Sequence, residues 1–435
     1  MQANLPEERI HRLVGPLLRF MHVEAAGGIV LLLFTVTALA LANSPLSEDF
    51  LALWKTKVGF SWGEFEMLYS LKHWINDGLM GIFFFVVGLE VKRELVLGEL
   101  RDPRRAALPF AAALGGMIVP AALYLALMRG TPEARGWGIP MATDIAFAVG
   151  CLAILGTRAP ASLRIVLLSL AIVDDIGAIL VIAIGYTTSV DLGMLALSGV
   201  GIGAVVLIGK LGVRSWVPYL VLGGVVWFGF HESGVHATIA GVILGLMTPA
   251  RSWVSDNLFQ EIVRQAEAVL TGDWGDASAR YSELRRVQLA AREALSPLER
   301  LVGALHPWVS FAIMPIFAFA NAGVPIQAGA FGEPVAVAVV VGLVVGKPVG
   351  ILLLSWLAVR AGIARLPTGV GWSAVAATGA LAGIGFTMSI FIAGLALSGA
   401  SLDAAKIGIL TGSVLSGALG VGLLYAVLPR PADAA

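Results

Sequence analysis

Two adjacent carboxylates lie inside an otherwise apolar segment of this 435-residue chain. Asp174 and Asp175 stand near the middle of the sequence LSLAIVDDIGAILVIAI, residues 168–184. An ionised aspartate at the centre of a bilayer costs about 2.5–3.5 kcal/mol, so the pair costs about 5–7 kcal/mol without compensation. Neighbouring residues on a helix diverge by about 100°, so both carboxylates can border one cavity but cannot hold one proton between them. We therefore interpret the pair as an ion-binding site.

Two further ionisable residues lie deep in apolar segments. Asp144 lies in GIPMATDIAFAVG, and Lys347 lies in VVVGLVVGKPVGILLLSWL. Lys347 is the only basic residue placed so deeply, so it is the expected partner of one of the carboxylates. Carboxylates can be neutralised by protons or by a small hard cation bound through oxygen. If proton and cation compete for the same carboxylates, alternating access to the site produces exchange.

The segment around Asp144 is a weak helix former, because it contains Pro140, Thr143 and flanking glycines. A second interrupted segment, ALAGIGFTMSIFIAG, carries three glycines close to Thr387 and Ser389. Two interrupted spans in different halves of a chain indicate a site at the membrane midplane in inverted-repeat transporters. The ends of such half-helices expose carbonyl or N–H groups, whose partial charges Asp144 and Lys347 would offset.

The composition requires a membrane protein. Hydrophobic residues make up 58% of the chain and charged residues only 13%, and the mean hydropathy is +0.87. A soluble domain has about a quarter of its residues charged. We expect an all-α polytopic protein with about twelve transmembrane helices, arranged as inverted repeats. The expected spans are 22–42, 71–91, 105–127, 138–156, 162–185, 192–209, 215–230, 234–250, 301–323, 333–358, 371–397 and 403–428.

Basic residues are concentrated at one of the two sets of span ends, which includes seven arginines from Arg251 to Arg300. The positive-inside rule therefore predicts that both termini are cytoplasmic, and an even number of spans agrees because it places both termini on the same side. The net charge is zero, so no nucleic-acid partner is expected. The expected parts are a cytoplasmic amphipathic segment 1–21, a transmembrane domain 22–428, an external β-hairpin or plain loop 43–70, a cytoplasmic helical insert 251–299 and a cytoplasmic tail 429–435.

Several motifs make the chain similar to a known family. They are GLEVKREL (88–95), ATDIAFAVG (142–150), VDDIGAI (173–179), GVHATIAG (234–241), LHPWVSF (305–311), FAFANAGV (317–324), GKPVGI (346–351) and GIGFTMSIFIA (383–393). With these motifs, the chain resembles the NhaA-type sodium/proton antiporters of bacterial membranes. The resemblance extends from about residue 21 to residue 428 and is broken mainly by the insert 251–299.

The resemblance implies a fold with two crossing, interrupted helices and no cofactor. It implies that Asp174 and Asp175 bind Na+ or Li+ and H+ alternately, with Asp144 and Thr143 at the helix break. Lys347 would be the charge partner of Asp174 and would carry a transported proton when their bond opens. The expected activity is electrogenic antiport that extrudes sodium and regulates pH across the bacterial inner membrane. The expected partners are these ions, the lipid bilayer and a second copy of the chain in a homodimer.

Some residues match positions that the family links to pH response. Glu90, Arg93 and Glu94 match a cytoplasmic cluster of this kind, although they also fit ordinary helix-end charge with i,i+4 spacing. His236 matches a family histidine, with a simple packing role as the alternative. The sequence departs from the family before LHPW, where Val302 and Gly303 replace a glutamate and a histidine. The pH dependence is therefore expected to differ, with Glu299 nearby as a substitute carboxylate and His306 in a structural role.

Other functions account for fewer of these residues. An intramembrane aspartyl protease needs carboxylates from two facing helices, whereas this pair is adjacent on one helix. A passive channel favours rings of charge around an oligomer axis. The remaining alternatives are carriers of similar fold, either a potassium/proton antiporter or a sodium-coupled carrier of an organic solute.

Overall fold

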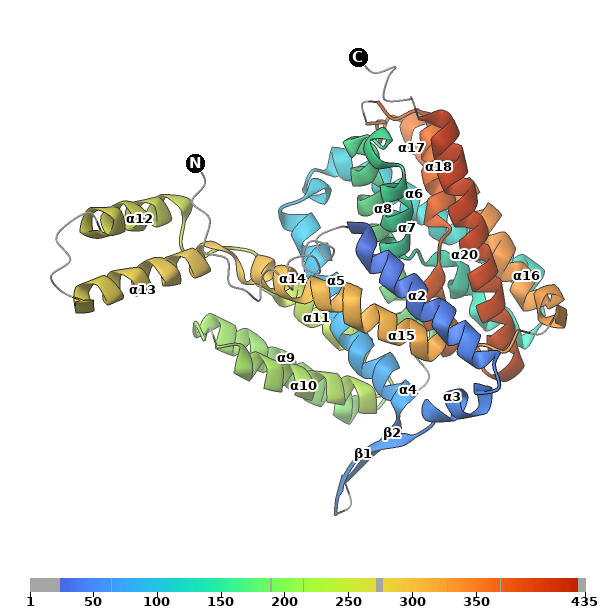
Figure 1. Ribbon diagram of the computed structural model, residues 1–435, viewed down its shortest axis with the longest axis horizontal. Coiled ribbons are helices and arrows are strands. Elements are labelled where there is room, and N and C mark those ends of the chain that lie inside the picture. The colour runs from blue at the N-terminus through green and yellow to red at the C-terminus, as the bar shows by residue number, and fades with distance from the viewer. Residues whose placement is uncertain are drawn as a thin grey trace.

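The computed structural model describes residues 24–63, 65–187, 190–213, 215–270, 277–326, 328–367 and 369–428, and these form mostly helices (Figure 1). The predicted N-terminal segment 1–21 and the predicted tail 429–435 lie outside the described residues.

Seven helical segments among the described residues are long and apolar enough to cross a membrane. They are Leu71–Val96, Pro103–Leu127 (α6), Ala161–Gly185 (α8), Leu192–Lys210 (α9), Pro297–Asn321, Pro334–Arg360 and Gly399–Val427 (α20). Two further pairs of helices pass the same test together, which makes nine if each pair is one span. The chain is therefore a multi-pass helical membrane protein.

Three of the long segments contain a π-helical turn between α-helical parts. They are α4 (Leu71–His73), η1 (Trp74–Leu79) and α5 (Met80–Val96); α14 (Pro297–Trp308), η5 (Val309–Ile313) and α15 (Met314–Asn321); and α16 (Pro334–Val341), η7 (Gly342–Gly346) and α17 (Lys347–Arg360). Single π-turns inside α-helices are frequent at functional sites. Of these three turns, η1 contains Asp77 and η7 ends immediately before Lys347, and both residues are discussed below.

The two bent pairs are the interrupted segments that the sequence predicts. The first joins η3 (Pro132–Met141) to α7 (Ile145–Ile154) at a bend of 43°. The second joins α18 (Trp372–Ala382) to α19 (Phe386–Ala396) at a bend of 50°. Three further α-helices belong to the bundle, namely α2 (Glu24–Ala42), α10 (Trp216–Glu232) and α11 (Thr238–Met247). Short 3₁₀ turns are η2 (Glu99–Arg101), η4 (Gly156–Arg158) and η6 (Ala328–Gly332).

Small residues let helices approach to backbone contact, as is usual in membranes. A Cβ added at Gly115 of α6 would lie 2.0 Å from the carbonyl oxygen of Gly350 in α17. The reverse addition, at Gly350, would lie 2.0 Å from the carbonyl oxygen of Gly115. This contact sets how α6 and α17 sit against each other, and therefore where Lys347, at the start of α17, points.

We expect Gly115→Ala to destabilise the protein by about 1–3 kcal/mol, because one added carbon in a close-packed contact forces the two backbones apart. The temperature of unfolding in detergent measures the loss. The control is Gly203→Ala on α9, where an added Cβ meets nothing within 4 Å. Equal unfolding temperatures for the two variants would show that the α6–α17 contact is not limiting.

Two parts project from the helical bundle, one at the bottom of the view and one at its left (Figure 1). One contains α3 (Ser47–Leu53) and an antiparallel hairpin of β1 (Lys57–Trp62) and β2 (Phe65–Ser70), which pair from Lys57↔Ser70 to Trp62↔Phe65. The other contains α12 (Asp256–Leu270) and α13 (Ala277–Ala294), within the insert 251–299. A two-stranded hairpin is marginally stable by itself, so its outer face needs support from another surface.

Candidate ion-binding site

The breaks of the two bent pairs lie against each other. The Asp144 amide donates to the carbonyl of Ile384 at 2.7 Å, and the hydroxyl of Thr143 lies 2.9 Å from the carbonyl of Ala382. The hydroxyl of Ser389, in α19, donates to the carbonyl of Ile139 at 2.7 Å. Groups freed by one interruption are therefore satisfied by the other, which is how non-helical backbone is tolerated at membrane depth.

Asp144 caps two half-helices at once. One of its carboxylate oxygens accepts from the amide of Phe147 at 3.1 Å, at the N-terminus of α7. The other accepts from the amide of Thr387 at 3.2 Å and from the Thr387 hydroxyl, at the N-terminus of α19. Helix N-termini carry positive partial charge, so two of them stabilise this buried carboxylate. The sequence pattern predicted the charge at the break but not Thr387 as its partner.

Lys347 is fully buried and joins α17 to both α8 and the first break. Its ammonium donates to Asp174 at 2.7 Å and also to the carbonyl of Met141, the last residue of η3. The same carboxylate oxygen lies 2.6 Å from the hydroxyl of Thr143. The lysine thus offsets both a carboxylate and the negative end of a helix.

The site contains more negative groups than positive ones. Asp144 and Asp174 are each 1% exposed, Asp175 is 3% exposed and Lys347 is 0% exposed. Three carboxylates and one ammonium carry two surplus negative charges when all are ionised, and burying such a surplus is strongly unfavourable. One oxygen of Asp174 has no hydrogen-bond partner among the described residues. The arrangement therefore needs protons or a cation to complete it.

An open pocket lies between the end of α5 and α8, the helix that carries the two aspartates. Its lining includes Glu94, Arg101 and Asp102, together with Ile165 and Ser169 of α8. Ser169 precedes Asp174 by between one and two turns of the same helix. Charged groups therefore line part of the pocket, and another part of its lining belongs to the helix that carries the aspartates.

The comparison with known proteins agrees with this geometry. Residues 18–424 match the family described as Na+/H+ antiporter 1. The chain belongs to the Na+/H+ antiporter 1 family. It is 54% identical to the Na(+)/H(+) antiporter NhaA of Rhodopirellula baltica over 428 residues, which cover 98% of this chain and 97% of that protein.

A second member of the family, the Na(+)/H(+) antiporter NhaA of Rhizobium meliloti, is also 54% identical, over 420 residues that cover 96% of each chain. The names of both relatives describe transporters and not enzymes. The family resemblance stated from the sequence motifs is confirmed over almost the whole chain.

The residues that match the family's pH-response cluster lie at the far end of α5. Glu90 lies 3.2 Å from Nδ1 of His306 in α14. The carboxylate of Glu94 accepts from the amide of Glu99 at 3.1 Å, and Arg93 lies in the last turn of the helix. Glu90 therefore connects α5 to α14, whereas Glu94 serves the local turn.

His306 contacts a charged group, although the sequence suggested only a structural role. Its distance to Glu90 makes it a candidate member of the same cluster. The sequence signal was weak, because the two residues are 216 positions apart in the chain. No helical spacing relates such distant residues, so only the packing of α14 against α5 brings them together.

His236 lies in the turn before α11, and its Nδ1 is 3.3 Å from the hydroxyl of Thr238. Its ring meets the edge of Phe391 on α19, with ring centroids 5.6 Å apart. The histidine thus contacts one of the two half-helices that carry the site.

The three positions near the departure from the family pattern have local roles. Val302 is buried beside Leu89 and Leu298, and a Cβ at Gly303 would meet nothing within 4 Å. Glu299 accepts from the amide of Ser296 at 2.9 Å, and Ser296 in turn caps α14. This capping box occupies the carboxylate of Glu299. The geometry gives no support to Glu299 as a substitute for the missing glutamate.

Proposed function

We propose that this protein is an electrogenic antiporter that extrudes sodium or lithium in exchange for protons across a bacterial inner membrane. The observation that carries the proposal is the excess of buried carboxylates over lysine at the crossing of two interrupted helices. Membership of the Na+/H+ antiporter 1 family supports it. The proposed site consists of Asp174 and Asp175 with Thr143 and Asp144 at the break, and Lys347 as the charge partner.

The proposed cycle follows from competition for the same oxygen atoms. In the described state, the Lys347 ammonium occupies one oxygen of Asp174. A sodium ion prefers oxygen ligands, so it enters only when the carboxylates are ionised and the lysine leaves. A displaced ammonium is buried without its counter-charge, which favours loss of its proton. Return of the empty site then carries protons on the lysine and on the aspartates, so more than one proton moves per sodium.

Alternating access requires the half-helices to move around the site. The pocket at the end of α5 is the proposed cytoplasmic opening, because Lys92, Arg93, Arg101 and other basic residues gather at this end of the spans. The pH-response role of Glu90, Arg93, Glu94 and His236 is part of the same proposal. Glu90 and His236 are the better supported of the four, since Glu90 contacts His306 of α14 and His236 contacts Phe391 of α19.

The proposed architecture has twelve spans with both termini in the cytoplasm. The nine spans counted by length and composition become twelve when α2, α10 and α11 are added. The breaks in the η3–α7 and α18–α19 pairs support an inverted repeat, because they lie in different halves of the chain. The projecting β1–β2 hairpin supports a homodimer, in which a second copy would cover its face.

The test uses everted membrane vesicles from a bacterium without its own antiporters. A dye that senses acid follows the internal pH while sodium, lithium or potassium is added between about pH 6.5 and 9. We expect sodium and lithium, but not potassium, to raise the internal pH, and the rate to depend on membrane voltage. A response to potassium would indicate a potassium/proton antiporter. No response to any of the cations from correctly inserted protein would contradict antiport and favour a solute carrier.

A further inference from the structure

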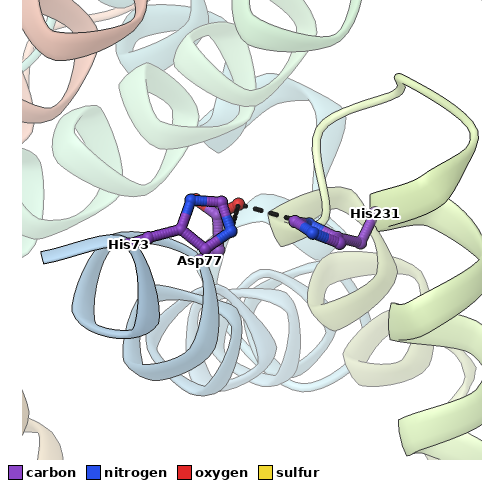
Figure 2. A group of neighbouring side chains, drawn as sticks. All are labelled: His73, Asp77 and His231. Carbon is purple, nitrogen blue, oxygen red and sulfur yellow. Dashed lines mark ion pairs between the residues drawn. The ribbon is translucent and has the colours of Figure 1, made fainter. Parts of the chain in front are cut away.

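A second cluster of ionisable side chains lies at the opposite end of the span Leu71–Val96 from Glu90. It consists of His73 at the end of α4, Asp77 in η1 and His231 near the end of α10 (Figure 2). His73 and Asp77 are four positions apart, so they share one face of their helix. One ligand atom from each of the three residues lies within 4.8 Å of the other two. We call these three residues the His–Asp–His cluster.

The distances in the cluster are close to those of a metal site. Oδ2 of Asp77 lies 3.6 Å from Nε2 of His73 and 3.4 Å from Nδ1 of His231. In a tetrahedral zinc site with bonds of about 2.0–2.1 Å, ligand atoms are about 3.3 Å apart. Two of the three separations therefore need little change, and only the two imidazole nitrogens have to move closer. In Figure 2 both rings lie beside the carboxylate.

One nitrogen atom of the cluster has no hydrogen-bond partner among the described residues. Nε2 of His73 is buried and makes no hydrogen bond among the described residues. A buried nitrogen without a partner is unfavourable, and a bound ion would satisfy it. The side chains are 33%, 17% and 11% exposed for His73, Asp77 and His231, so an ion can reach the cluster past His73.

The surroundings hold both rings in place. Nε2 of His231 lies 3.9 Å from the carboxylate of Glu232, which accepts from the hydroxyl of Tyr69 at 3.2 Å. The distance between His231 and Glu232 is longer than a hydrogen bond, and a shift of about 1 Å would let the carboxylate accept from His231, as carboxylates behind ligating histidines do. The ring of His231 also stacks on Trp227, and that of His73 stacks on Tyr69.

We propose that His73, Asp77 and His231 bind one divalent transition-metal ion, for which Zn2+ is the best match. Two imidazoles and one carboxylate are a ligand set typical of zinc, with water in the fourth position. Sodium, magnesium and calcium prefer sites built from oxygen, so the transported ion is a poor occupant. The bound metal would connect η1 to α10, and it would do so away from Asp174 and Asp175.

The competing interpretation is a packing cluster of histidine and aromatic rings that binds no ion. Isothermal titration calorimetry of the purified full-length chain, without a histidine tag, separates the two. We expect one Zn2+ per chain for the parent and no comparable heat with Mg2+. For His73→Gln combined with His231→Gln, we expect binding at least about 100-fold weaker. No Zn2+ binding by the parent, or unchanged binding by the double variant, would overturn the proposal.

Two further variants make the test specific. Glu232→Gln should weaken Zn2+ binding about 10-fold, because it removes the negative charge beside His231 but no ligand. His306→Gln removes a histidine of α14 that contacts Glu90, at the other end of the span Leu71–Val96 from the cluster. It should leave Zn2+ binding unchanged. If instead His306→Gln abolishes binding, the site lies elsewhere and the assignment is wrong. The parent's calorimetry remains decisive if the double variant does not fold, and an Asp174→Asn protein should still bind Zn2+.

Discussion

Asp175→Asn is expected to abolish sodium-driven proton release from everted vesicles, with an initial rate at least about 100-fold below the parent. Asparagine has the same shape as aspartate but cannot ionise, so it neither attracts the cation nor carries a proton. Loss of a group outside the ligand shell already costs about 10–100-fold in metal affinity, and loss of a ligand costs more. Burial of Asp175 at 3% exposure leaves little water to replace the missing oxygen.

The matched control for this prediction is Asp49→Asn, the same chemical change on an exposed residue of α3. It should exchange sodium at the rate of the parent. Asp174→Asn should behave like Asp175→Asn, because one oxygen of Asp174 has no hydrogen-bond partner among the described residues and is therefore available to a cation. Normal exchange by Asp175→Asn protein would contradict the proposed ligand set, even if the family assignment remained correct.

Lys347→Met is expected to lower the free energy of unfolding by about 3–5 kcal/mol, the usual cost of breaking a buried ion pair by removing one partner. Methionine is of similar length and fills the space, so the loss reports the charge of Asp174 and not a cavity. The carbonyl of Met141 also loses its donor. Thermal unfolding of the purified protein in detergent measures the change.

A double substitution separates charge from packing. Lys347→Met with Asp174→Asn should be more stable than Lys347→Met alone, because it removes the uncompensated carboxylate. Lys210→Met, on an exposed lysine at the end of α9, serves as the control and should change stability by less than about 0.5 kcal/mol. If the double variant is the less stable one, the ion pair does not account for the role of Lys347.

Much of the fold could be predicted from local sequence. Long apolar segments must be helices in a membrane, because every backbone group needs an internal partner there. The glycines and Pro140 that weaken helix locate both bends. The ends of elements were less predictable: the first bent pair begins as a 3₁₀-helix at Pro132, whereas the expected span began at residue 138. Such ends depend on caps and neighbours, not on apolar length.

The contacts of the site were predictable only in part. The isolated position of Lys347 in an apolar segment indicated that it pairs with a carboxylate, and the family resemblance pointed to Asp174. The partner of Asp144, Thr387, and the partner of Glu90, His306, were not identified. In each case the two residues lie far apart in the chain, and hydropathy does not reveal how deep or at what rotation two helices meet.

The sequence by itself determined the class of protein, the positions of the helix breaks and the ionisable residues that we propose exchange a cation for protons. These follow from composition, from helix propensity and from the cost of charge in lipid, all of which are local properties. The tertiary structure decided which of these residues touch. It placed Asp144 at two helix N-termini and brought His73 and Asp77 to His231. The physical reason is that helix rotation and depth are set by close packing, as at Gly115 and Gly350, which no single span encodes.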